Sequence, residues 1–131
     1  MKALWRDTLE KPSATSVHFC CSEEFDLLVS SGLQLYVATL VEDVSSQALF
    51  GIVAEVLRFP ACFGSNWDAL DDCLTDLEWL APVGIVLALR DANRACVENS
   101  LALRRFLASW SEANEFWLEA NRPFHLLFVC K

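Results

Sequence analysis

The chain has 131 residues, of which 54% are hydrophobic, and this composition excludes an intrinsically disordered protein, which would be poor in apolar residues. Its 18 acidic residues against 10 basic ones give a net charge of -8, so the surface repels phosphate backbones and anionic lipids; we expect neither nucleic acid nor a membrane as a partner. The six cysteines form no C-x-x-C pair, and no apolar stretch suits a signal peptide or a membrane span. We therefore expect an acidic, cytoplasmic protein with reduced thiols.

The first third of the chain carries weak secondary-structure signals. Residues 1–15 are expected to form an extended or loosely packed arm. Residues 16–20 are predicted to form a short strand, and residues 23–31 a short helix. Residues 33–41 alternate between the two faces and are rich in β-formers, which predicts a strand.

Two amphipathic helices are predicted next. The first begins after Ser45 or Ser46 as N-cap and ends at Pro60, because a residue before proline leaves the helical region; its apolar face is Leu49, Ile52, Val53 and Val56. The second is capped by Asn66, and its apolar face is Leu70, Cys73, Leu74 and Leu77. Both faces follow the helical spacing i, i+3, i+4, i+7.

The last third predicts two buried strands around a helix. Residues 83–89 and 124–129 are continuous apolar runs, which is typical of strands covered on both faces of a parallel sheet. Between them, residues 101–118 form an amphipathic helix with apolar positions Leu103, Phe106, Leu107, Trp110 and Trp117. The resulting order over residues 33–129 is β-α-α-β-α-β, which predicts an α/β fold: a small parallel sheet packed with helices, preceded by an extra strand-helix piece.

The second helix is unusually acidic. No lysine or arginine occurs in residues 59–89, which contain Asp68, Asp71, Asp72, Asp76 and Glu78. Asp68, Asp72 and Asp76 are spaced i, i+4, i+8, so they share one helix face opposite the apolar one. Like charges at this spacing destabilise a helix by about 0.2–0.5 kcal/mol per pair, and no intrahelical lysine offsets them. The stripe indicates a surface for a cationic partner.

These acidic residues also allow other interpretations. A solvated acidic face is the simplest of them. A divalent-metal site needs carboxylates that converge on one point, whereas a straight helix spreads them, and a catalytic acid pair needs a pocket that the sequence does not indicate. His18 and His125 fit no zinc-binding spacing with the cysteines, and no Cys–His pair is singled out as a nucleophile. We expect no cofactor, no metal and no catalytic residue.

The stretch 59–76, FPACFGSNWDALDDCLTD, resembles the signature of the barstar family, the protein inhibitors of secreted ribonucleases. The shared pattern is Pro, two residues, an aromatic, Gly, x, Asn, x, Asp-Ala-Leu, x, Asp-Cys-Leu. The resemblance covers about residues 33–129 and implies a small parallel sheet with helices. We expect one barstar-like domain over residues 1–131, in which residues 1–31 are an N-terminal extension.

The resemblance implies a function by occlusion rather than an enzyme. It implies an inhibitor, or immunity protein, that binds a basic toxin, foremost a ribonuclease, as a 1:1 complex and plugs its active site with the acidic helix. Asp72 would be the central mimic of an RNA phosphate, with Asp68 beside it. The other implied contact residues are Asp71, Asp76, Cys62, Phe63, Gly64, Asn66, Trp67 and, on a later helix, Glu112. Gly64 is expected to take a backbone angle that other residues avoid.

Two positions depart from the namesake of the family. That protein has an aromatic residue at the position of Cys62 and a tryptophan at that of Asp71, both of which make contacts there. A partner other than the namesake's ribonuclease is therefore expected. A toxin of another class, or a basic cellular protein with no toxin involved, remains an alternative. Trp67 and Trp79 are either core residues or contact anchors beside the acidic face.

Overall fold

The structure is a computed structural model that describes residues 2–40, 44–61, 63–80 and 83–130. Its centre is a four-stranded sheet in which every paired strand is parallel to its neighbour. The strands are β1 (Val17–Cys21), β2 (Tyr36–Thr39), β3 (Ile85–Arg90) and β4 (Phe124–Cys130), and their order across the sheet is β1-β4-β3-β2. The predicted small parallel sheet is confirmed.

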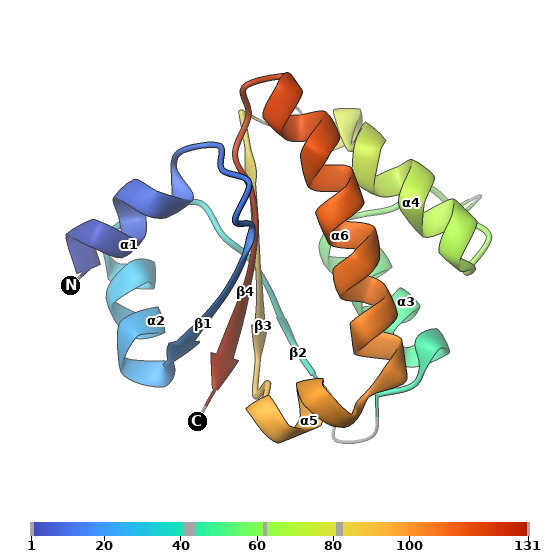
Figure 1. Cartoon of the computed structure of the whole chain (residues 1–131), viewed down its shortest axis with the longest axis horizontal. Helices are drawn as coiled ribbons and strands as arrows, with labels where there is room; N and C mark the ends of the chain where they lie inside the picture. The colour runs from blue at the N-terminus through green and yellow to red at the C-terminus, as the bar shows by residue number, and fades with distance from the viewer. Residues whose placement is uncertain (1, 41–43, 62, 81–82, 131) are drawn as a thin grey trace.

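Helices cover both faces of this sheet (Figure 1). One face carries α1 (Lys2–Leu9) and α2 (Ser22–Ser30). The other carries α3 (Ser46–Val56), α4 (Trp67–Asp76) and α6 (Leu101–Glu119). The short α5 (Arg94–Asn99) and a single 3-10 turn, η1 (Glu78–Leu80), complete the helices of the described residues. Among those residues, no helix combines the length and apolar character that a membrane crossing requires.

The central strands are apolar in sequence because both faces of the sheet are covered by helices. Successive strand residues point to opposite faces, so Leu87 packs under the α3–α6 layer while Val86 and Ala88 pack under α1 and α2. Both layers are apolar, and every residue of β3 except Arg90 is buried. On the α6 side, Phe124 stacks between the indole rings of Trp110 and Trp117, with ring centroids 3.9 Å and 5.1 Å away. Trp110 and Trp117 are therefore core residues.

Most expected elements are present with shifted ends. Ser45 is the N-cap of α3, since its Oγ accepts a hydrogen bond from the Ala48 N–H at 3.1 Å. Helix α3 ends at Val56, earlier than the proline limit at residue 60. The strand expected over residues 33–41 is shorter at both ends; residue 41 lies outside the described residues.

The expectation of a loose arm over residues 1–15 is wrong. Residues 2–9 form helix α1, and Leu9 is 1% exposed in a cluster with Phe25 and Leu28 of α2. The Arg6 guanidinium donates a hydrogen bond to the Ser31 carbonyl oxygen, which fixes α1 on α2. Helix α5 was also not predicted; its six residues are too few to show a helical repeat.

A histidine pair, of which His125 is buried and His18 half-buried, anchors the segment between α1 and β1. The Nε2 of His18 on β1 lies 2.9 Å from Nδ1 of His125 on β4, and Nε2 of His125 lies 2.7 Å from the Lys11 carbonyl oxygen. Because the Lys11 oxygen only accepts, His125 donates from Nε2 and accepts at Nδ1, so His18 donates to it. Burial, with a smaller contribution from His125, lowers the pKa of His18 to about 4. Burial also lowers the pKa of His125. Both rings are thus neutral at pH 7.

Candidate functional site

Helix α4 begins at Asn66, as the sequence predicts. The Asn66 Oδ1 accepts a hydrogen bond from the Ala69 N–H at 2.8 Å, and Asn66 itself has extended backbone angles. Asp68 lies in the first turn, where the helix dipole favours a negative charge. The helix ends at Leu77, which has a left-handed φ of 48° and a fully buried side chain. The orientation of α4 is therefore fixed at both of its ends.

The apolar face of α4 packs against α6. Leu70 and Leu74 are fully buried in the main core, and the Trp117 Nε1–H of α6 donates a hydrogen bond to the Leu74 carbonyl oxygen at 2.8 Å. This packing turns the opposite face of α4 to solvent, at the outer flank of the molecule (Figure 1). The packing on α6 thus explains which side of α4 is exposed.

Three of the aspartates of α4 lie on that outer face. Asp68, Asp72 and Asp76 are exposed, at the successive i, i+4 positions that the sequence pattern gives them. Among the residues that the structure describes, none of the three forms an ion pair. The carboxylates therefore form one open row, which we call the acidic row.

Asp71 behaves differently from the acidic row. It is half-buried, and its Oδ2 lies 3.7 Å from an Nη of Arg105 on α6. The same guanidinium donates a hydrogen bond to the Ser109 Oγ at 2.7 Å and lies 5.1 Å from the centroid of the Trp67 ring. An intrahelical lysine is absent, as the sequence shows, but a base from another helix offsets this one carboxylate.

The aromatic residues of the predicted contact loop pack largely against the core. Phe63 is half-buried and meets Phe50 and Phe59 edge to face, at centroid distances of 6.1 Å and 4.9 Å. Trp67 meets Phe50 in the same manner at 4.8 Å. Both rings are half-buried, so each keeps a part that is accessible to solvent. Cys62, another predicted contact, lies outside the described residues.

The expectation of an unusual backbone angle at Gly64 is wrong. The positive φ falls on the next residue, Ser65, at 51°, and Gly64 itself lacks one. A Cβ at Gly64 would lie 3.0 Å from the Asn66 Nδ2, whose amide also donates a hydrogen bond to the Gly64 carbonyl oxygen at 3.3 Å. Close approach of the capping side chain, rather than backbone freedom, is thus what a side chain here would disturb.

Two further residues flank α4. Glu112 is exposed on α6, two helical turns beyond Arg105 and therefore on the same side of that helix. Trp79 in η1 is 37% exposed, and its Nε1–H donates a hydrogen bond to the Leu57 carbonyl oxygen at 2.8 Å. One edge of Trp79 is thus tied to the core while part of its ring stays accessible.

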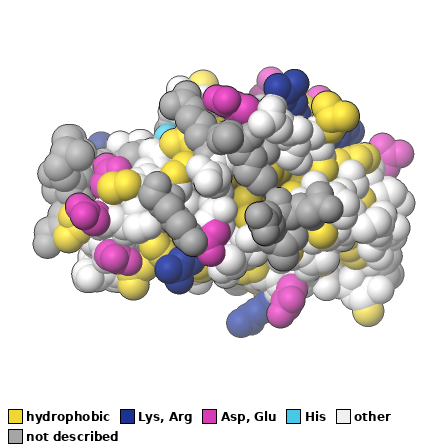
Figure 2. All heavy atoms as spheres, turned by 90° about the horizontal axis from the view of Figure 1, so that it is seen from below, with side chains coloured by type: hydrophobic (Ala, Val, Ile, Leu, Met, Phe, Trp, Pro, Cys, Tyr) yellow, Lys and Arg dark blue, Asp and Glu magenta, His cyan; other side chains and the backbone are white. Residues whose placement is uncertain are grey.

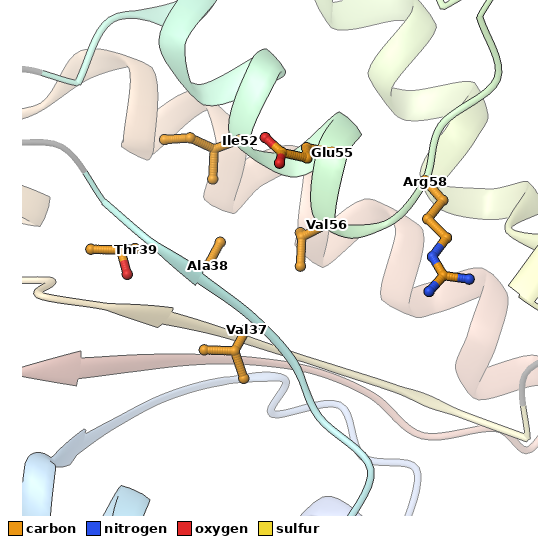
Figure 3. A pocket seen from close by; sticks show the side chains of 7 residues that line it. All are labelled: Val37, Ala38, Thr39, Ile52, Glu55, Val56 and Arg58. Carbon is orange, nitrogen blue, oxygen red and sulfur yellow. The ribbon is translucent and has the colours of Figure 1, made fainter.

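Elsewhere in the described part of the chain, the structure has a groove but no cluster of metal ligands. No group of three or more histidine, cysteine or acidic side chains in the described residues is placed to hold a metal ion. A groove of about 430 Å³ lies between β2 and α3 (Figure 3), and its lining holds one carboxylate and one guanidinium. The lining residues are Val37, Ala38, Thr39, Ile52, Glu55, Val56 and Arg58.

Acidic side chains also occur away from α4. Figure 2 shows the end of the molecule at which β1 and β4 finish, where acidic side chains are dispersed among hydrophobic and uncharged ones. The acidic row contains three of the 18 acidic residues of the chain, so negative charge is not confined to α4. What distinguishes α4 is the alignment of its exposed carboxylates along one helix face.

Comparisons with known proteins agree with this geometry. A chain in the solved structure "Structure of Drosophila ORC bound to AT-rich DNA and Cdc6" is similar with a TM-score of 0.58 at 12% sequence identity, over 98% of the present chain and 44% of that chain. At this identity the likeness concerns the fold alone. The search of curated proteins found no match. The family model described as Barstar (barnase inhibitor) matches residues 35–129, which include all of β2, α3, α4, α6 and nearly all of β4. The chain therefore belongs to the barstar family.

Proposed function

We propose that the protein is an inhibitor that binds a basic ribonuclease as a 1:1 complex and covers its active site with α4. The observation that carries this proposal is the acidic row: Asp68, Asp72 and Asp76 are aligned, exposed and without an ion pair among the described residues. Membership of a family described as barnase inhibitors supports the same assignment. The inhibitor itself needs no catalytic group for this role.

The physical basis is mimicry of a polyanion. A ribonuclease positions arginines and lysines for the phosphates of its substrate, and a carboxylate offers those groups the same charge-assisted hydrogen bonds. Successive members of the acidic row are separated by about 6 Å along the helix, since each residue rises 1.5 Å. The row can therefore engage several basic groups at once. The net negative field of the molecule also speeds the approach of a cationic partner at low ionic strength.

A toxin of another enzymatic class is the second candidate. The observation that favours it is the inward position of Asp71, which occupies a contact position of the family's namesake but is held here by Arg105. The surface that faces a partner therefore differs from that of the namesake. Such a toxin would still be basic, because the acidic row would still have to be neutralised.

The experiment is capture with a matched control. The protein and a variant with Asp68, Asp72 and Asp76 changed to Asn are immobilised and exposed to lysate and culture fluid of the native organism. We expect a basic protein held by the first and lost by the second, whose ribonuclease activity is blocked by added wild-type protein. Capture by both variants alike would contradict a role for the acidic row. A basic captured protein without ribonuclease activity would select the second candidate.

A further inference from the structure

Two cysteines face each other where β1 and β4 end. The strand register pairs Cys21 with Cys130. Neighbouring strands lie roughly 4.7–4.9 Å apart, and residues in register on parallel strands direct their side chains to the same face of the sheet. A disulfide requires its two Cα atoms to be about 4.4–6.8 Å apart. The backbone therefore holds this pair within the range that a disulfide spans.

The surroundings of the two thiols differ. Cys21 is exposed, and its N–H donates a hydrogen bond to a carboxylate oxygen of Glu24 at 3.1 Å, where α2 begins. Cys130 is half-buried, and its thiol donates a hydrogen bond to the Ala92 carbonyl oxygen. The Cys21 thiol is thus accessible to a dissolved oxidant, while the neighbouring Cys130 thiol is partly shielded from solvent.

The adjacent Cys20 is set apart from this pair. It is 5% exposed and belongs to the apolar cluster under α1 and α2, on the opposite face of the sheet from Cys21. Burial, and then the charges of Glu24, Cys21 and Cys130, raise the pKa of Cys20 to about 12. It stays a protonated, unreactive thiol at pH 7, because the thiolate is the attacking species.

We propose that Cys21 and Cys130 form a redox pair that closes to an intramolecular disulfide when the protein meets a hydroperoxide. The Cys21 thiolate attacks the peroxide O–O bond, which yields a sulfenic acid on Cys21 and releases water, or an alcohol from an organic peroxide. The Cys130 thiolate then attacks the Cys21 sulfur and displaces the sulfenic oxygen as water. The two thiols lose two electrons and two protons in total, and one peroxide is reduced.

The consequence is a covalent tie across the sheet. The bond joins the end of β1 and the start of α2 to the end of β4, so the layer formed by α1 and α2 is fastened to the part of the chain that matches the barstar family. Helix α4 packs on α6, away from the ends of β1 and β4 (Figure 1). Oxidation is therefore expected to stabilise the fold while leaving the acidic row unchanged.

The test treats the purified, reduced protein with hydrogen peroxide and follows thiol content, intact mass and disulfide-linked peptides. We expect a monomer that has lost two hydrogen atoms and two titratable thiols, a peptide linking Cys21 to Cys130, and a higher Tm that returns on reduction. The variants Cys21→Ser and Cys130→Ser should lose all three effects, while Cys73→Ser, altered on α4, should keep them.

Three outcomes would overturn the proposal. These are a disulfide that links another pair of cysteines, a dimer joined through Cys21, and stepwise gain of oxygen at Cys21 while Cys130 remains a thiol. All three are read on the wild-type protein, so they do not depend on the folding of a variant. None bears on the proposed inhibitor function, whose acidic row lies on α4, away from the ends of β1 and β4.

Discussion

Arg105 on α6 lies 3.7 Å from the carboxylate of Asp71 on α4, and its guanidinium also covers the Trp67 ring at 5.1 Å. Asp71 and Trp67 are one helical turn apart, so a single side chain fastens the first half of α4 to α6. This contact removes one carboxylate from the surface and leaves the other three as the acidic row. Asp71 therefore helps to hold α4 on α6, whereas the other three aspartates stay exposed.

Replacement of Arg105 by Ala is expected to lower the free energy of unfolding by about 1–2 kcal/mol. A partly exposed ion pair contributes about 0.2–1 kcal/mol and a cation–π contact about 0.5–1 kcal/mol. Urea denaturation measures the change, and Arg122→Ala, at an exposed position before β4, is the matched control with little expected effect. Equal effects of the two variants would show that the Arg105 contacts do not stabilise α4.

The members of the acidic row are expected to contribute unequally to binding. Asp72→Ala should weaken the complex with the captured partner by about 3–5 kcal/mol, the usual cost of leaving one member of a buried ion pair alone. Asp76→Ala, at the rim, should cost about 0.2–1 kcal/mol. Titration calorimetry gives both values, and circular dichroism should show an unchanged fold. Small and equal losses would argue against Asp72 as the central contact.

The N-cap of α4 is expected to matter for stability independently of binding. Asn66→Ala removes the hydrogen bond to the Ala69 N–H and should cost about 0.5–2 kcal/mol in thermal or urea unfolding. Asn66→Ser keeps a capping oxygen and should restore most of the loss. If Ser fails where Asn succeeds, the second hydrogen bond, to Gly64, would be the important one.

The layer of α1 and α2 is expected to be an integral part of the fold. Leu9→Ala should destabilise the protein by about 2–5 kcal/mol, because Leu9 is 1% exposed and its removal leaves a cavity. Leu101→Ala, at a residue that is 79% exposed, changes the same side chain at the surface and should have little effect. A neutral Leu9→Ala variant would mean that α1 does not hold the sheet.

Stability is expected to fall as the pH drops from about 6.5 to about 4. The pKa of His18 is about 4 in the folded protein against 6.5 ordinarily, so the unfolded chain binds more protons in that window. Buried, neutral His125 acts in the same direction. Urea midpoints measured across this range should decline, and less steeply for His18→Gln. An identical slope in the variant would assign the acid sensitivity to other groups.

Some elements could be predicted from the sequence because they depend on residues that are close in the chain. Asn66 predicts the start of α4 because a side chain caps its own helix, and the apolar run of β3 predicts burial on both faces. The i, i+4, i+8 spacing of Asp68, Asp72 and Asp76 predicts the helix face on which the acidic row lies. These features need only residues that are close in the chain.

The features that were missed depend on distant parts of the chain. Helix α1 is stabilised by the contact of Leu9 with α2 and the sheet, so its own sequence carries little of the signal. The pairing of Asp71 with Arg105 requires the packing of α4 on α6, which no spacing within either helix reveals. Gly64 was assigned backbone freedom, whereas its constraint is the nearby Asn66 side chain.

The position of β4 between β1 and β3 has a consequence during synthesis. β1 leaves the ribosome long before β4, with which it pairs in the sheet, so it stays unpaired until β4 has been synthesised. Meanwhile the apolar sides of α1 and α2 have no sheet to cover, and such pairings across a long loop form slowly. The apolar faces of α1 and α2 are thus not covered by the complete sheet until β4 has been synthesised, and exposed apolar surface of this kind is what chaperones bind.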